Sequence, residues 1–267
     1  MYKRQAYYSL GICYREIGNI QMAEKTFLKA FNIDPEYPYL KGQLQFMKNH
    51  LCDWSNYNES KKNIEKDIVK NKKTITPWQA LSIVESPKLL KDNTKLFINN
   101  KVFNDKNLID KRKITLGYFS PDFCEHAVSN QFKQILKLHD KKKFEIIGFY
   151  LNSKQDEKLY EMKTYFDKFF DINQMSTEDI IKLTEAQKVD IAIDLAGYTY
   201  ANRYQVFNQR CAPIQVSYLG FAGSTGLNNM DYLIADKTVI PENCRKYYSE
   251  KIIYCLLYTS PSPRDVV

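Results

Sequence analysis

From residue 114 onward the chain alternates short apolar runs with segments of helical periodicity, and this alternation limits the folds open to it. The apolar runs cover 114–119, 144–150, 168–172, 189–195, 214–218, 231–235 and 251–254, and the helical patterns between them cover 129–138, 158–166, 176–185 and 201–209. Strands separated by helices pair in parallel, because each helix carries the chain back along a face of the sheet. The sequence therefore predicts an α/β fold with a Rossmann-like parallel sheet covered by helices on both faces.

The first part of the chain has the spacing of a tetratricopeptide repeat, which is a hairpin of two helices. The positions that fit the repeat are Tyr7, Leu10, Gly11, Tyr14, Gly18, Ala23, Phe27, Ala30 and Pro35. Gly11 and Ala23 are small enough for the two helices to cross closely. Tyr14 and Phe27 are expected to fill the groove between them, and Pro35 to end the second helix. One repeat cannot bury its own apolar face, so further repeats are expected upstream.

The segment after the repeat is also expected to be helical. A polar helix is predicted over 39–70, with one apolar side. That side would hold Leu44, Met47, Leu51, Trp54, Ile64 and Ile68. A helix starting near Pro77 and another over 87–100 are predicted next, and the polar residues 99–112 are expected to form a linker.

Both ends of the chain resemble a transposon-derived sequencing adapter. Residues 1–5 match one strand of that element, and 255–267, with its Ser-Pro-Ser-Pro-Arg stretch, match a reading frame of the same element. We therefore expect natural sequence over about 6–254, continuing beyond both sides; a genuine Pro/Ser tail is the alternative. The expected division is 1–5 and 255–267 as adapter artefact, 6–38 as tetratricopeptide repeat, 39–112 as helical linker region and 113–254 as the Rossmann-like lobe.

Charge and composition argue against several classes of protein. The chain has 39 Lys and Arg against 31 Asp and Glu, a net charge of +8. Its lysines are scattered and its aromatic residues lie beside Ile and Leu at core-like positions, which argues against nucleic-acid binding. The six cysteines include no CxxC pair and the three histidines are isolated, so we expect no metal site. There is neither an apolar run of about eighteen residues nor a basic-then-apolar leader, so we expect a cytoplasmic protein without a membrane partner.

Candidate functional residues follow the predicted strands, because sheets of this kind bind ligands at the carboxyl ends of their strands. After the strand at 114–119 come Asp122 and His126, a carboxylate and an imidazole. The structural alternative is that Asp122 caps the next helix and His126 is a packed turn residue. Residues 194–199 end a strand before a glycine. Residues 218–226 carry three glycines in seven residues, which lets backbone N–H groups approach a phosphate or a sugar.

These motifs, in this order, resemble the tetratricopeptide-linked protein O-GlcNAc transferases, a family that includes the plant SPINDLY-type O-fucosyltransferases. The segments that carry the resemblance are Leu51-Cys-Asp-Trp54 with Tyr57, Ile114-Thr-Leu-Gly-Tyr118 with Ser120 and Asp122-Phe123 and His126, Asp194-Leu with Gly197-Tyr-Thr199, Arg210 with Ala212-Pro-Ile-Gln215, Leu219-Gly220 with Gly223 and Gly226, Met230-Asp-Tyr232, and Tyr248-Ser-Glu-Lys251. The resemblance implies a two-lobed GT-B glycosyltransferase, with this chain carrying the N-terminal lobe. Such an enzyme moves a sugar, here N-acetylglucosamine from UDP-GlcNAc, to Ser and Thr of proteins, inverting the anomeric carbon without a metal or another cofactor.

The resemblance also implies roles for individual residues. The family's Asp-Phe-x2-His segment lines the active site, which carries over to Asp122 and His126, and its histidine has been considered as the proton acceptor. The carried-over substrate-binding residues are Tyr198 and Thr199, in the loop that faces the acceptor, and Gly220 and Gly223, in the loop near the donor sugar. Protein acceptors would bind through the tetratricopeptide repeats.

The chain also departs from the family. Pro77-Trp78-Gln79 stands where animal members have histidines, Ala127-Val128 replaces the Pro and Thr that commonly follow the active-site histidine, and Ala222 replaces a frequent Pro. The second lobe, which supplies most contacts to the nucleotide, is absent from the sequence, so we expect this piece to be inactive alone. Two alternatives stay open: a non-catalytic tetratricopeptide interaction scaffold with a degenerate transferase lobe, and an O-fucosyltransferase of the same family.

Overall fold

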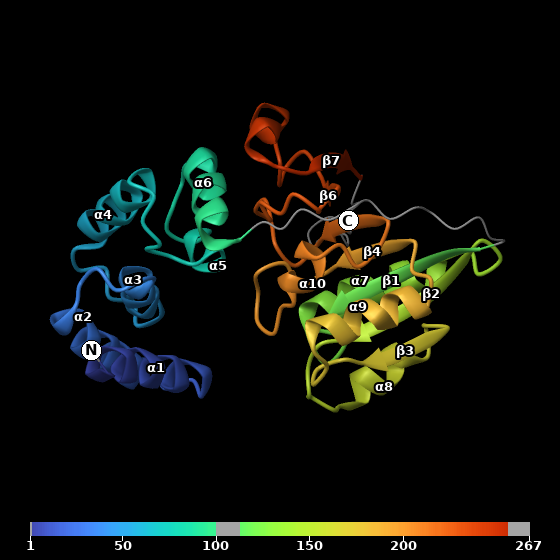
Figure 1. The fold of residues 1–267 in the computed structure, drawn as a ribbon, viewed down its shortest axis with the longest axis horizontal. Helices are drawn as coiled ribbons and strands as arrows, with labels where there is room; N and C mark the ends of the chain where they lie inside the picture. Colours follow the sequence, from blue (N-terminus) through green and yellow to red (C-terminus); the bar gives the residue numbers. More distant parts are fainter. Residues whose placement is uncertain (1, 100–112, 256–267) are drawn as a thin grey trace, which may run out of the picture. The chain divides into compact units, whose positions relative to one another are not determined.

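The computed structural model describes residues 2–99 and 113–255, which form two compact units (Figure 1). The first unit is all helical, and the second is built around a parallel sheet. The expected linker and the expected adapter tail lie outside the described residues, apart from residues 99 and 255. Residues 2–5 belong to the first helix of the chain.

The first two helices, α1 (Tyr2–Glu16) and α2 (Ile20–Ile33), form the helical hairpin that the sequence predicts. Gly11 lies directly against Phe27, because a Cβ built on this glycine would lie 2.5 Å from the phenylalanine ring. Ala23 and Phe27 are completely buried. Asn19 caps the N-terminus of α2, because its side-chain oxygen accepts the N–H of Met22 at 3.1 Å. The close crossing expected at Gly11 is therefore present.

Four more helices complete the description of this unit: α3 (Leu40–His50), α4 (Tyr57–Val69), α5 (Pro77–Ala80) and α6 (Pro87–Phe97). The prediction of one helix over 39–70 is wrong, because the chain turns between α3 and α4. Cys52 and Asn56 adopt positive φ angles of 55° and 57°. Asp53 accepts the N–H of Ser55 at 2.9 Å, so its side chain stabilises a turn in place of a helical hydrogen bond.

Aromatic side chains line an open cavity beside α5. Trp54 is 58 % exposed, so it does not join the apolar helix side expected of it. With Tyr57 and Trp78 it lines an open cavity of about 630 Å³. Gln79 is buried, and its Nε2 donates to Oε1 of Gln43 at 2.9 Å, which ties α5 to α3.

The second unit contains a seven-stranded sheet in the order β3-β2-β1-β4-β5-β6-β7, and all its neighbouring strands are parallel. The strands are β1 (Ile114–Ser120), β2 (Phe144–Tyr150), β3 (Lys168–Asp171), β4 (Ile191–Asp194), β5 (Ile214–Tyr218), β6 (Tyr232–Ala235) and β7 (Lys251–Tyr254). The helical segments are α7 (Ala127–Leu138), α8 (Glu157–Lys163), α9 (Thr177–Ala186), α10 (Tyr204–Asn208) and a 3₁₀ turn, η1 (Glu242–Tyr247). The helix α10 is shorter than the pattern at 201–209 predicts, since Ala201 has a positive φ of 52° and delays its start.

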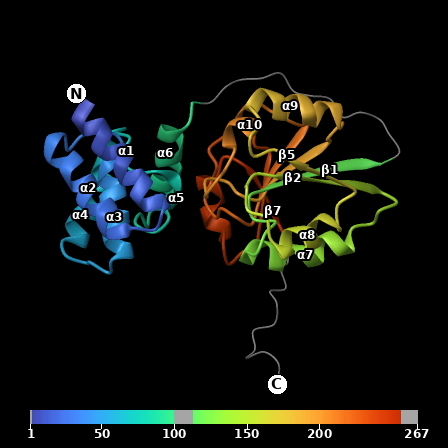
Figure 2. The same cartoon turned by 90° about the horizontal axis from the view of Figure 1, so that it is seen from below.

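Helices cover both faces of the sheet. Figure 2 shows α9 and α10 on one face and α7 and α8 on the other. Alternate residues of β1 serve the two faces. Leu116 and Tyr118 join a buried cluster with Phe132 of α7, whereas the ring of Phe119 packs edge-on against Phe207 of α10 at 5.2 Å. The predicted α/β fold, with a parallel sheet between two layers of helices, is confirmed.

Candidate functional site

The sheet contains a topological switch point between β1 and β4. From β1 the strand order runs outward to β2 and β3, and from β4 it runs the other way to β5. The two strands end side by side, with Phe119 paired with Asp194. Three loops begin at this edge: the β1 loop (121–126), the β4 loop (195–199) and, after β5, the glycine loop (219–226). In doubly wound sheets this is where ligands bind.

The β1 loop brings Asp122 and His126 together. Oδ2 of the aspartate lies 3.7 Å from Nδ1 of the histidine, and their side chains are 17 % and 49 % exposed. Burial raises the pKa of the Asp122 carboxyl above its usual range, and the nearby imidazole opposes this rise. A half-buried acid and an exposed imidazole therefore lie next to each other at the carboxyl end of β1.

The residue that caps α7 is His126. Its Nδ1 accepts the N–H of Val128 at 3.2 Å, and the helix begins at the residue after the histidine. The structural alternative in which Asp122 caps this helix is wrong, because the side chain that accepts the N–H of the first turn is His126. The β1 loop is also fastened to the start of α8, where Asp156 accepts the N–H of Glu125 at 2.9 Å.

Asp194 holds the β4 loop from inside. It is 3 % exposed, and its Oδ1 accepts the N–H groups of Ala196 and Gly197 at 2.9 and 3.1 Å. Burial raises the pKa of Asp194 to about 6, against the effect of the two N–H donors, which lower it. In the sequence, Asp194 stands out only as part of a motif. Its place as the last residue of a buried strand, just before a glycine turn, was the signal for a structural carboxylate.

Tyr198 and Thr199 use their hydroxyls within the loops. The Tyr198 hydroxyl donates to the carbonyl of Thr225 at 2.5 Å, and its ring packs edge-on against Phe221 at 5.2 Å. Oγ1 of Thr199 donates to the carbonyl of Ala196 at 2.8 Å. Tyr198 is only 6 % exposed. Through its contacts with Thr225 and Phe221 it joins the β4 loop to the glycine loop.

The glycine loop packs closely on the β4 loop. A Cβ built on Gly220 would lie 2.1 Å from the carbonyl oxygen of Leu195. A Cβ on Gly197, which has a positive φ of 58°, would run into the side chain of Phe221. Gly223 is buried in the same loop. The absence of a side chain at Gly220 thus serves the approach of one loop to another.

Glu250 lies beside the candidate site, and its role was not predicted from the sequence. It is 5 % exposed and lies just before β7. Its Oε2 accepts the Ser224 hydroxyl at 2.8 Å, and its Oε1 accepts the N–H and the hydroxyl of Thr225 at 2.6 and 2.5 Å. The carboxylate therefore clasps the glycine loop. The only signal in the sequence was the motif Tyr248-Ser-Glu-Lys251, which does not tell what the glutamate binds.

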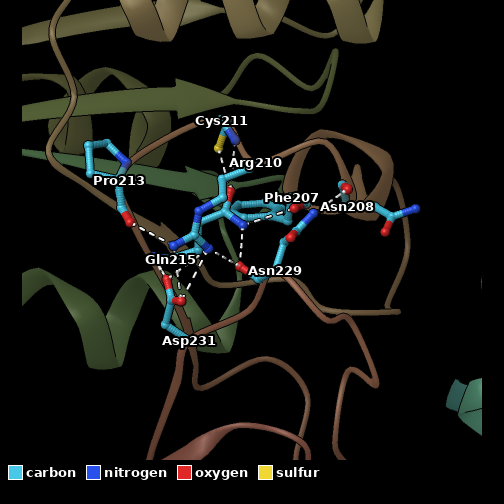
Figure 3. Close-up of polar contacts among 8 residues, drawn as sticks. All are labelled: Phe207, Asn208, Arg210, Cys211, Pro213, Gln215, Asn229 and Asp231. Atoms are coloured by element: carbon cyan, nitrogen blue, oxygen red, sulfur yellow. Dashed lines mark hydrogen bonds and ion pairs between the residues drawn. The ribbon is translucent and has the colours of Figure 1, made fainter. Parts of the chain in front are cut away.

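Arg210 and Asp231, which belong to the quoted motifs, lie at the amino ends of the strands, opposite to the candidate site. Figure 3 shows the Arg210 guanidinium against Asp231, with Nη1 and Oδ1 3.1 Å apart, and against the backbone carbonyls of Asn229 and Pro213. Oδ2 of Asp231 also accepts the N–H of Gln215 at 2.8 Å. These residues lie at the amino ends of β5 and β6. They join the two strands at the end opposite to the candidate site.

Two further features concern metals and membranes. Within 2–99 and 113–255, no group of three His, Cys, Asp or Glu side chains is arranged to hold a metal ion. Of the helices in these ranges, none is both long enough and apolar enough to cross a membrane.

The chain is similar to known glycosyltransferases in sequence. Residues 83–258 match the model of glycosyl transferase family 41. The "probable UDP-N-acetylglucosamine–peptide N-acetylglucosaminyltransferase SEC" of Arabidopsis thaliana is 33 % identical over 144 residues, which cover 54 % of this chain and 15 % of that protein. The protein of the same description named SPINDLY, from the same plant, is 33 % identical over 165 residues, covering 59 % and 18 %. The matched part of this chain thus spans less than a fifth of these relatives.

A solved structure extends the similarity to the fold. A mutant of the O-GlcNAc transferase of Thermobaculum terrenum matches with a TM-score of 0.71 at 18 % identity. The match covers 94 % of this chain and 50 % of that one. At this level of identity the likeness concerns the fold alone.

Proposed function

The chain belongs to glycosyl transferase family 41, and from this membership we propose that the protein is a protein O-glycosyltransferase. It moves a sugar from a nucleotide sugar to Ser or Thr hydroxyls of proteins, with inversion of the anomeric carbon and without a metal ion. We assign this activity to the longer protein, since the matched part of the chain spans 15 % to 18 % of its curated relatives. In that protein the lobe is 113–254 and the repeat is 6–38.

The observation that carries this proposal is the Asp122–His126 pair at the carboxyl end of β1. An inverting displacement needs a proton acceptor beside the attacking hydroxyl. A carboxylate and an imidazole 3.7 Å apart supply such groups at the edge where doubly wound sheets bind ligands. Burial, which raises the pKa of Asp122, makes its carboxylate a stronger base than an exposed one.

The β4 loop and the glycine loop are proposed to form the wall of the substrate site. Tyr198 and Thr199 contribute by shape, because their hydroxyls already donate to backbone carbonyls. Gly220 and Gly223 keep the glycine loop close to the β4 loop. We propose UDP-GlcNAc as the donor, since two relatives that are 33 % identical carry UDP-N-acetylglucosamine in their descriptions. The helical hairpin α1–α2 is proposed to help bind the protein acceptor.

The test is sugar transfer by the longest protein that the gene encodes, with labelled UDP-GlcNAc and a protein acceptor. We expect His126→Ala and Asp122→Asn each to lower the rate about 100-fold or more, the usual share of proton transfer and its positioning. Glu125→Gln, which changes an exposed side chain of the same loop, is the matched control and should stay within about twofold. Transfer at the wild-type rate by both His126→Ala and Asp122→Asn would rule out the proposed site.

A further inference from the structure

Two groups, the N–H of Val128 and the carboxylate of Asp122, lie near the same ring nitrogen of His126. Nδ1 lies 3.2 Å from the backbone nitrogen of Val128 and 3.7 Å from Oδ2 of Asp122. The first distance is that of a hydrogen bond, and the second is too long for one. The nitrogen is thus used as the cap of α7.

This contact decides where the proton of a neutral imidazole lies. One ring nitrogen of neutral histidine is a donor and the other an acceptor. Because Nδ1 accepts the N–H of Val128, it carries no proton, so the proton is on Nε2. The arrangement needed for a histidine base is the reverse: Nδ1–H donates to a carboxylate, and Nε2 is free to accept.

We infer that neutral His126 keeps its proton on Nε2, and that in the proposed transferase site it caps α7 and donates a hydrogen bond, while Asp122 accepts the proton. The catalytic part of this inference rests on the proposed function. In the reaction the Ser or Thr oxygen bonds to the anomeric carbon. The bond from that carbon to the diphosphate oxygen breaks and leaves its electron pair on the nucleoside diphosphate. The hydroxyl proton passes to the carboxylate of Asp122.

The charge and burial of the pair agree with this division of roles. Asp122, at 17 % side-chain exposure, is the more enclosed of the two, and burial raises its pKa. His126 is half exposed, so its Nε2–H can reach a ligand at the edge of the sheet. The hydrogen-bond donor, His126, then lies beside the proton acceptor, Asp122, on the same short loop.

The tautomer can be measured on the chain itself by nitrogen NMR of the histidine rings. There are three histidines in the sequence, and His126→Asn identifies the signals of this one. We expect a ¹⁵N shift of the unprotonated type at Nδ1 and of the protonated type at Nε2. Val128→Pro removes the capping N–H and should abolish this preference. His139, which contacts the Tyr118 hydroxyl at 2.9 Å, is the internal control. The opposite tautomer at His126 would overturn the inference.

Hydrogen exchange at the Val128 amide gives a second reading. Asparagine offers an oxygen acceptor at a capping position, whereas alanine offers none. We expect His126→Ala to speed exchange of this amide about fivefold, the ratio for a typical cap, and His126→Asn to change it little. Equal exchange in both variants would refute the cap.

These readings need no sugar transfer, so they separate the inference from the proposed function. If the tautomer is as inferred and the longer protein transfers no sugar, the proposed function fails and the ring assignment stands. If Asp122→Asn transfers at the wild-type rate while His126→Ala does not, Asp122 is not the acceptor and the inference fails.

Discussion

Replacing Gly220 by alanine tests the packing of the glycine loop on the β4 loop. The new Cβ would lie 2.1 Å from the carbonyl oxygen of Leu195 and 2.9 Å from its carbonyl carbon. Non-bonded heavy atoms pack at about 3.5 Å, so the loops must part by roughly 1.4 Å. Overpacking of this kind costs about 1–3 kcal/mol. Parting the loops also strains the hydrogen bond from Tyr198 to Thr225, worth about 1 kcal/mol. We expect a total loss of about 3 kcal/mol.

Urea unfolding of the chain measures this loss. With a slope of about 2 kcal/mol per molar urea, the midpoint of the sheet unit should fall by about 1.5 M, followed by far-ultraviolet circular dichroism. Both tryptophans, Trp54 and Trp78, lie in the helical unit, so their fluorescence follows the unfolding of that unit separately. Ala222→Gly, at an exposed position of the glycine loop, should cost no more than about 1 kcal/mol. An unchanged midpoint for Gly220→Ala would refute the close approach of the two loops.

Three more predictions concern the carboxylates of the sheet unit. Asp231→Ala should cost about 3 kcal/mol in urea unfolding, since it leaves the Arg210 guanidinium, 9 % exposed, without its counter-charge; Glu242→Ala, at an exposed ion pair, should not change the midpoint measurably. Glu250→Ala should lower stability by about 3 kcal/mol, because three donors lose one buried acceptor, and Glu250→Gln should lower it less; equal losses would show that the carboxylate's acceptor atoms are not what matters. Asp194 has a pKa raised to about 6, so the folded state binds its proton more tightly than the unfolded chain does, and the contribution of this carboxyl to stability should rise as pH falls from about 6 to about 4. The gain is on the order of 1–3 kcal/mol, and Asp194→Asn, which keeps the oxygen acceptor, should remove it when unfolding is compared at the two pH values.

The fold was predictable from the sequence where a periodic pattern and a steric requirement agree. The apolar runs give the strands, and their alternation with helices gives the parallel sheet, because few other connections are open to such a chain. The hairpin was predictable from Gly11, since only a glycine leaves room for Phe27 there. The turn after α3 was not predicted. It depends on Asp53, a side chain that accepts a backbone N–H, and this local hydrogen bond outweighs the helical pattern on either side.

The position of the candidate site in the fold could be predicted from the sequence, and the contacts within it less so. Placing Asp122 and His126 after β1 followed from the rule for doubly wound sheets. Which of them caps α7 was not predictable, because both side chains can accept an N–H and only the path of the loop decides between them. The clasp by Glu250 joins residues about 25 positions apart in the chain, and no local pattern reports such a contact.

The position of Glu250 has a consequence for synthesis on the ribosome. The strands β1, β4 and β5, which carry the loops of the proposed site, are complete by residue 218, but the carboxylate that fixes the glycine loop comes just before β7. A nascent chain exposed only as far as β6 has the sheet centre without this clasp. The loop therefore gains its final shape late in translation, after the edge strand has emerged, and a pause before residue 250 leaves the wall of the site unfinished.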